Sequence, residues 1–191
     1  MTLELVLRIA FPTLWIAWLI YWWISARNVK KNRWREPLVS QLPHRLPLIL
    51  AAILLSAPRW LPRALTGRFL PEGNLFLALG VALLAAGLGF AVWARRHLGR
   101  NWSSQVVVKE DHALIQSGPY RHLRHPIYTG ILLAFLGTAV SIGEWRGLLA
   151  FLCVVFSFAV KGRAEEQRME GIFPEYRQYR RETAALIPFV Y

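Results

Sequence analysis

The segment from residue 117 to residue 130, Ser-Gly-Pro-Tyr-Arg-His-Leu-Arg-His-Pro-Ile-Tyr-Thr-Gly, holds the side chains of this chain best suited to chemistry. Its basic residues, at the start of a long apolar run, are Arg121, His122, Arg124 and His125. Such side chains are costly to hold next to hydrocarbon, and Pro119 and Pro126 exclude a simple continuous helix. In a membrane protein such a segment indicates a binding or catalytic site, so the rest of the sequence must show whether the apolar run spans a membrane.

The backbone of this segment can also be predicted. Gly118-Pro119-Tyr120 forms a turn, because proline presets its φ angle and glycine tolerates conformations that other residues avoid. Pro126 disfavours helical geometry at His125, so Arg124 and His125 are extended and a helix begins at Pro126. Unpaired N–H groups at this helix start, beside two arginines, predict an anion-binding corner. The alternative is that the arginines only anchor a helix end to lipid phosphates.

An acidic pair follows the last apolar run. Glu165 and Glu166 are predicted to lie on a continuation of the last apolar helix, where they could bind a cationic ligand group near the basic segment. The alternative is a solvated charged helix, in which neighbouring arginines offset repulsion between carboxylates at i, i+4. Tyr176 and Tyr179, at i, i+3, share a helix face that we expect to be ordinary packing.

Five apolar segments must position these residues, and each is compared with the roughly 20 residues that a spanning helix needs. Hydrophobic residues make up 55% of the 191-residue chain. The predicted segments are 3–25, 46–65, 75–94, 127–142 and 145–160, of which the second is interrupted by Pro58 and Arg59. The last two read as a tight helical hairpin over 127–160. The predicted fold class is an all-α, polytopic membrane helix bundle with five spanning helices. The alternative is four spans, with the segment 46–65 lying in the membrane interface.

The charges support this topology. The net charge is +12, and most of the 23 Lys and Arg residues lie in the loops on one side of a five-span arrangement. The positive-inside rule then places the amino terminus outside and the carboxyl terminus in the cytoplasm. Residues 1–94 form a region of three spans, and residues 95–191 form the catalytic region. Its hydrophilic stretches, 95–126 and 161–191, both lie on the cytoplasmic side, where they are predicted to form one site.

Other classes of site find little support in the sequence. No nucleic-acid-binding module or continuous basic face is present, so we expect no nucleic-acid partner. The five histidines lack metal-ligand spacing, and Cys153, the only cysteine, excludes an internal disulfide. No required protein partner is evident.

The order of motifs in residues 95–191 resembles the integral-membrane methyltransferases related to isoprenylcysteine carboxyl methyltransferase, a group that includes bacterial phospholipid N-methyltransferases. The motifs that carry the resemblance are Gly-Arg-Asn-Trp-Ser (99–103), His112, Gly-Pro-Tyr (118–120), Arg-His-Pro-x-Tyr-x-Gly (124–130), Glu-Glu (165–166), Phe173, Tyr176, Tyr179 and Pro188. One departure is Phe173-Pro174-Glu175-Tyr176, which is one residue shorter than the usual spacing.

The resemblance implies a cytoplasmic S-adenosyl-L-methionine pocket with a lateral opening for a lipid-like acceptor. The residues that it implies for the cofactor are His112, Leu114, Ile115, Gly118, Pro119, Tyr120, His125, Pro126, Tyr128, Glu165 and Glu166. The residues that it implies for catalysis are Arg124 and Glu165. A cofactor with an ammonium, a ribose diol and a sulfonium needs carboxylates, polar backbone and aromatic faces, which these residues supply.

The sequence leaves two chemical classes of methyl acceptor open, a carboxylate and an amine. A carboxylate acceptor, as in a prenylated cysteine, needs a nearby cation, which Arg124 or Arg163 could supply. An amine acceptor, as in phosphatidylethanolamine, needs a carboxylate to take its proton, and Glu165 or Glu166 could serve. The motifs favour the isoprenylcysteine carboxyl O-methyltransferase. The other partners expected are membrane lipids.

Two further hypotheses compete with methyl transfer. One is an NADPH-dependent membrane sterol or enone reductase, whose basic loop would meet the 2′-phosphate of the cofactor. The other is a non-enzymatic membrane scaffold or transporter component, which the lack of a charged residue well inside a late span makes less suitable for ion transport.

Overall fold

The structure is a computed structural model that describes residues 2–27, 32–35, 37–56, 60–102, 107–109 and 114–187. The long helices in this part of the chain are α1 (Leu3–Ser25), α2 (Leu38–Ser56), α4 (Asn74–Leu98), α5 (Pro126–Ile142) and α6 (Trp145–Glu170). Short helices are α3 (Arg63–Thr66), η2 (Gly99–Asn101), η3 (Gly118–Arg121) and α7 (Tyr176–Glu182). The predicted helical class is confirmed.

Four of the described helices, α1, α2, α4 and α6, are long and apolar enough to cross a membrane. Helix α5 has 17 residues and is shorter, although equally apolar. At about 1.5 Å per residue it approaches the roughly 30 Å of a hydrocarbon core, so it fits the bundle as a fifth membrane helix. The chain is an integral membrane protein.

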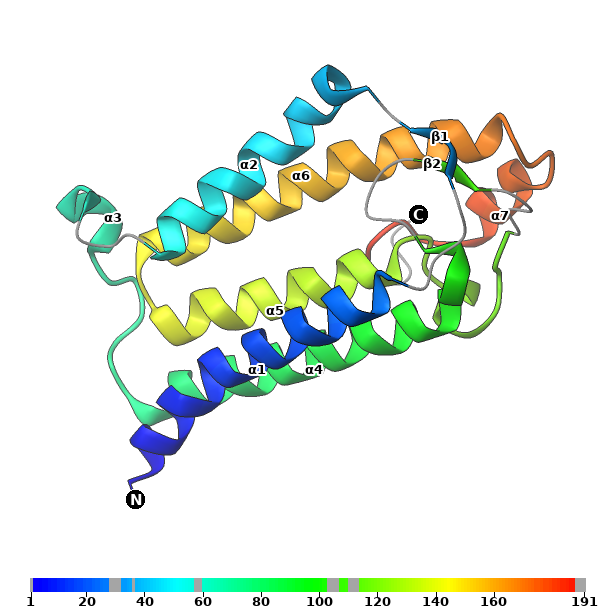
Figure 1. Cartoon of the computed structure of the whole chain (residues 1–191). Helices are drawn as coiled ribbons and strands as arrows, with labels where there is room; N and C mark the ends of the chain where they lie inside the picture. Colours follow the sequence, from blue (N-terminus) through cyan, green and yellow to red (C-terminus); the bar gives the residue numbers. More distant parts are fainter. Residues whose placement is uncertain are drawn as a thin grey trace.

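The helices form two groups that meet where α5 joins α6. Helix α2 packs along α6, while α4 packs along α5 and α1 packs along α4. Figure 1 shows α5 and α6 diverging from the Gly143–Glu144 connection toward the end of the molecule that carries α7. Gly143 has φ +66°, a left-handed conformation that closes α5 tightly and so permits the predicted hairpin.

Glycine is essential where α4 crosses α5. A Cβ atom on Gly87 would lie 2.5 Å from the carbonyl oxygen of Gly130, and one on Gly130 would lie 2.6 Å from the amide nitrogen of Ala91. The two backbones are therefore in direct contact, which is how helices associate in lipid without a hydrophobic driving force. On the outer side of this pair, Trp15 of α1 donates its Nε1–H to Thr138 Oγ1 at 3.3 Å.

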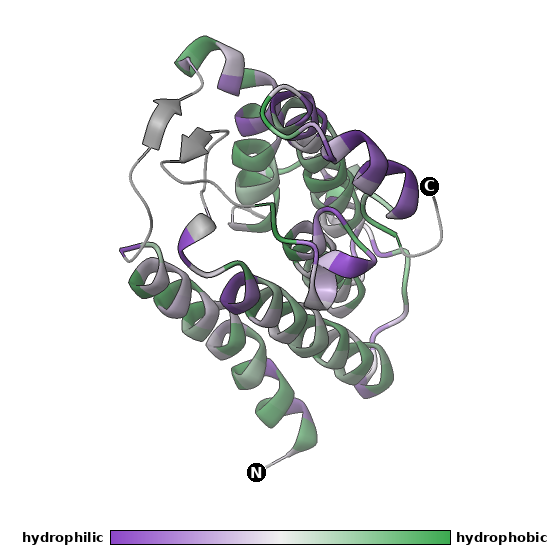
Figure 2. Cartoon of the chain, turned by 90° about the vertical axis from the view of Figure 1, so that its right-hand side faces the viewer, coloured by the Kyte–Doolittle hydropathy of each residue, from purple (hydrophilic) through white to green (hydrophobic). Residues whose placement is uncertain are grey.

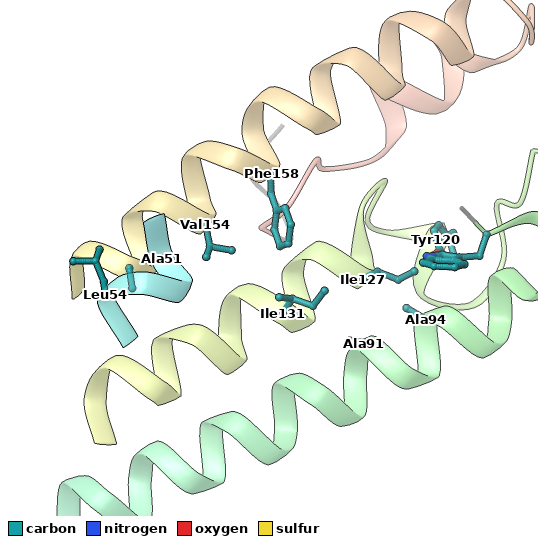
Figure 3. Close-up of a cluster of buried hydrophobic side chains, with 11 residues drawn as sticks. Ala51, Leu54, Ala91, Ala94, Tyr120, Ile127, Ile131, Val154 and Phe158 are labelled. Atoms are coloured by element: carbon teal, nitrogen blue, oxygen red, sulfur yellow. The ribbon is translucent and has the colours of Figure 1, made fainter. Parts of the chain in front are cut away.

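The core continues between the two groups. Figure 3 shows Phe158 and Val154 of α6 facing the same interior as Ile127 and Ile131 of α5. Ala51 and Leu54 extend this cluster onto α2. Figure 2, which views the end that carries α7, shows hydrophilic residues concentrated there around apolar membrane helices.

Two features of the fold differ from the sequence prediction. Helix α2 spans Leu38–Ser56, whereas the prediction placed this segment at 46–65. Pro43 and Pro47 lie inside α2, where a membrane helix tolerates proline because neighbours satisfy the freed backbone groups. The structure also adds a short antiparallel pair of strands, β1 (Asn32–Arg35) and β2 (Val107–Lys109), that was not predicted.

Candidate active site

The Gly-Pro-Tyr turn lies where α4 ends, as helix η3. Gly118 has φ +59°, and a Cβ atom there would lie 2.6 Å from Cε1 of His97. His97 also makes a 2.9 Å hydrogen bond between its Nε2 and the hydroxyl of Ser117. The turn is thus fitted onto the His97 ring. Pro119 and Tyr120 are buried beneath it.

The start of α5 is closed by the C-terminal segment. Helix α5 begins at Pro126, as predicted. The amide of Arg124 donates to the carbonyl oxygen of Ala184 at 2.8 Å, and the amide of His125 donates to that of Ala185 at 3.1 Å. These bonds hold the backbone just before α5. The anion-binding corner predicted for the unpaired N–H groups of the first turn of α5 stays a prediction.

Arg124 and Glu166 form a buried ion pair at this closure. Arg124 Nε lies 2.7 Å from Glu166 Oε1, and both side chains are 8% exposed. The Nη1 atom of Arg124 also donates to the carbonyl oxygens of Arg180 and Thr183. Arg180 approaches the same carboxylate, with its Nε 3.4 Å from Glu166 Oε2. This network fastens α7 and the segment after it to the ends of α5 and α6.

Glu165 faces a different set of side chains. Its Oε1 accepts a 2.8 Å hydrogen bond from the hydroxyl of Tyr128 and lies 3.9 Å from Lys161 Nζ. His125 stands between the two carboxylates, with Nδ1 3.6 Å from Glu165 Oε2 and Nε2 3.1 Å from Glu166 Oε1. The two adjacent glutamates therefore have separate partners, and His125 couples them.

Stacked rings line this group. The Tyr128 ring lies 5.3 Å from His125 at an angle of 10°, and 4.4 Å from Phe158 at 18°, measured between centroids. Lys161 Nζ lies 5.4 Å from the Tyr128 centroid. Flat aromatic faces beside a carboxylate are suited to a ligand with both a π-system and a positive charge.

Helix α7 supports the turn from below. The Tyr179 hydroxyl donates to the carbonyl oxygen of Tyr120 at 2.7 Å. Burial raises the pKa values of both Tyr120 and Tyr179 above the usual range, so both phenols stay protonated. Tyr176 packs edge-on against Tyr179, with 5.7 Å between centroids, and both rings are buried. The predicted packing role of this tyrosine face is confirmed.

The structure brings most of the predicted residues together. Leu114 and Ile115 lie half-buried just before η3, and Ile115 packs against the main core cluster. Arg163 is exposed, unlike Arg124. His112, Ser103 and Pro188 lie outside the described residues.

Two neighbours of the site, His97 and Lys161, were not predicted. His97 lies 20 residues from its partner Ser117, so no local pattern identifies it. Lys161 could have been found, because it precedes Glu165 at the i, i+4 spacing that pairs opposite charges on a helix.

Comparison with known proteins places this chain in a family. Residues 75–176 match the model of the phospholipid methyltransferase family, and this range includes α4, η3, α5 and α6. The chain belongs to the phospholipid methyltransferase family. The match begins 20 residues before the resemblance seen in the sequence, because α4 is part of the shared unit.

Individual relatives agree with this family. The chain is 28% identical over 143 residues to the cobalt-zinc-cadmium resistance protein CzcN of Cupriavidus metallidurans, covering 73% of this chain and 58% of that protein. It is 31% identical over 119 residues to protein-S-isoprenylcysteine O-methyltransferase of Schizosaccharomyces pombe, covering 60% of this chain and 48% of that enzyme. The chain thus spans about half the length of the curated relatives it matches.

A solved structure shares the fold. It is that of a eukaryotic intramembrane Ras methyltransferase, isoprenylcysteine carboxyl methyltransferase. The TM-score is 0.53 at 19% identity, and the likeness covers 80% of this chain and 52% of that one.

Proposed function

We propose that this protein is an S-adenosyl-L-methionine-dependent membrane methyltransferase that acts on a lipid or lipidated acceptor. The observation that carries the proposal is the position of Glu165 beside stacked aromatic rings, in a chain of the phospholipid methyltransferase family. Family membership favours methyl transfer over the reductase and scaffold hypotheses.

The residues present fit the proposed cofactor. Glu165 is 19% exposed, so its carboxylate can still reach a ligand while it accepts the Tyr128 hydrogen bond. His125 and Tyr128 place aromatic rings beside the Glu165 carboxylate, an environment that suits an adenine and a sulfonium. When bound, the cofactor supplies an electrophilic methyl group.

The residues of the site then position the reacting groups and need not act as a strong acid or base. Tyr128 holds the Glu165 carboxylate in place, and Glu166 holds Arg124 and His125. The C-terminal segment closes over the start of α5 and helps to exclude water from the site. Exclusion of water and in-line alignment are the main requirements of a methyl displacement.

We favour a carboxylate acceptor on a prenylated cysteine, because the relatives that match include several isoprenylcysteine O-methyltransferases. A carboxylate is nucleophilic without loss of a proton, so no general base is needed. The phospholipid amine remains the second candidate, since the family model carries the phospholipid name. In both cases the amino terminus is placed outside and the site in the cytoplasm by the positive-inside rule.

The test is transfer of a labelled methyl group from S-adenosyl-L-methionine by the detergent-solubilised protein. The acceptors are a farnesylated cysteine with a free carboxylate, the same compound as its methyl ester, and phosphatidylethanolamine. Label on the free acid alone supports the favoured acceptor, while label on the phospholipid alone supports the second. Absence of label from all three, with no binding of the donor, would refute the proposed function.

A further inference from the structure

Arg95, in the last turn of α4, is a buried cation. Its side chain donates from Nη1 to the carbonyl oxygen of Gly99 and from Nη2 to that of Ser25, both at 2.7 Å. The residue is only 4% exposed. No described residue accepts a hydrogen bond from its Nε, and no described Asp or Glu forms an ion pair with it.

Aromatic side chains surround this guanidinium. Its carbon Cζ lies 4.5 Å from the centroid of the Trp102 ring. Trp102 meets Trp22 edge-on at 5.3 Å, and Trp22 stacks on Trp18 at 4.8 Å. The Nε1–H of Trp18 is also buried without a described acceptor. A row of indole rings from α1 therefore leads to the buried cation.

This arrangement lies beside the proposed active site. Trp102 and Tyr120 belong to the same buried cluster as Ala94, the residue before Arg95. Figure 3 shows Tyr120 and Ala94 close together at the end of α4. Tyr120 is part of the turn proposed to line the cofactor.

The charge of Arg95 is compensated less than a buried charge usually is. Burial of a charge costs several kcal/mol unless an opposite charge and hydrogen bonds offset it. Two carbonyl dipoles and a ring face supply part of that compensation, while the Nε donor stays unmet. Arginine is also the side chain whose planar donors match a carboxylate best.

We propose that Arg95, stacked on Trp102, binds the carboxylate of a ligand. The inference rests on the proposed function, which offers two sources of that group: the aminoacyl part of the methyl donor and the free carboxylate of the acceptor. The indole row suits an apolar chain attached to such a carboxylate. Arg95 then recognises charge in the part of the site that Glu165 does not reach.

Arg95→Gln and Arg95→Lys test the proposal, and Arg96→Gln is the matched control because Arg96 is the next residue of α4 and is exposed. Affinities of the solubilised protein are measured for S-adenosylhomocysteine and for methylthioadenosine, which lacks the aminoacyl group. They are also measured for a farnesylated cysteine and its methyl ester. Thermal unfolding without ligand checks the fold of each variant.

The two sources give different results. If Arg95 binds the donor, Arg95→Gln weakens S-adenosylhomocysteine by about tenfold to a hundredfold and leaves methylthioadenosine unchanged. If it binds the acceptor, the donor affinities stay constant, and the variant loses the preference of the wild type for the free acid over the ester. In either case Arg95→Lys restores part of the affinity, because the charge is kept.

Other results overturn the proposal. One is unchanged affinity for all four compounds in Arg95→Gln, which would mean that Arg95 has only a structural role, linking α1 and η2 through its hydrogen bonds. Another is equal weakening of all four together with a lowered unfolding temperature that Arg95→Lys does not repair. A wild-type protein that binds none of the compounds would overturn the proposed function as well. Failure of the Arg95 proposal alone is recognised because the wild type then still binds the compounds.

Discussion

Glu166→Gln is the change that tests most sharply whether the C-terminal segment is fastened by charge. The substitution keeps the size of the side chain and removes its charge. It leaves the Arg124 guanidinium, 8% exposed, without the carboxylate that lies 2.7 Å from its Nε. The hydrogen bonds of Arg124 to the carbonyl oxygens of Arg180 and Thr183 remain.

The cost follows from these contacts. Loss of one partner of a buried ion pair costs about 3–5 kcal/mol. The remaining carbonyl contacts, and the ability of glutamine to accept a hydrogen bond, place Glu166→Gln near the lower end of that range. About 3 kcal/mol corresponds to a roughly hundredfold increase in opening of the segment.

Hydrogen exchange measures this opening directly. The amides of Arg124 and His125 donate to Ala184 and Ala185, so their protection reports whether the segment is in place. We expect protection of these amides to fall roughly a hundredfold in Glu166→Gln in detergent micelles. In the control Glu165→Gln, protection stays close to that of the wild type, because the Arg124–Glu166 ion pair is kept and only the longer 3.6 Å approach of Glu165 to the His125 side chain loses its charge. Equal protection in the wild type and Glu166→Gln would refute the ion pair as the fastening.

Further predictions concern glycine and tyrosine positions. Gly118→Ala is expected to lower stability by about 1–3 kcal/mol more than Gly99→Ala, and to weaken donor binding; both residues have positive φ, but only Gly118 has a neighbour, the His97 ring, within 4 Å. Gly87→Ala should lower the thermal unfolding temperature, whereas Gly89→Ala, with no atom within 4 Å of its added Cβ, should leave it unchanged or slightly raised; equal losses would contradict the close α4–α5 contact. Tyr179→Phe should cost about 1–3 kcal/mol, because the buried Tyr120 carbonyl loses its donor. Burial raises the pKa of Tyr179, so its contribution is complete below about pH 10 and is lost as pH rises further; the wild type should therefore lose stability in alkali more steeply than Tyr179→Phe.

Much of the fold follows from composition along the chain. Helices α1, α4, α5 and the start of α6 agree with their predicted segments within a few residues, because lipid imposes long runs of apolar residues. The predicted segment 46–65 began too late in the chain for α2. The first half of this helix contains Pro43, His44, Arg45 and Pro47, which lower its apolar character although it is helical. The β1–β2 pair joins residues about 75 positions apart in hydrophilic loops, which no local pattern reveals.

The candidate site divides in a similar way. The turn at Gly118, the helix start at Pro126 and the placement of Glu165 and Glu166 on α6 were predictable, since glycine, proline and helix continuation act locally. The contacts of Arg95 and His97 were not, because they depend on which elements the end of α4 meets. The hydrogen bonds that Arg124 and His125 donate to Ala184 and Ala185 likewise depend on the path of a segment distant in the sequence.

We propose that the Glu165 end of the molecule binds S-adenosyl-L-methionine. The most direct measurement is the thermal stability of the solubilised wild type and of Glu165→Gln with S-adenosyl-L-methionine, S-adenosylhomocysteine or NADPH. A ligand that binds only the folded state at about 100 times its dissociation constant adds about 2.7 kcal/mol. We expect this gain from the first two ligands in the wild type, its loss in Glu165→Gln, and no gain from NADPH. A gain from NADPH alone, or an unchanged gain in Glu165→Gln, would contradict the claim.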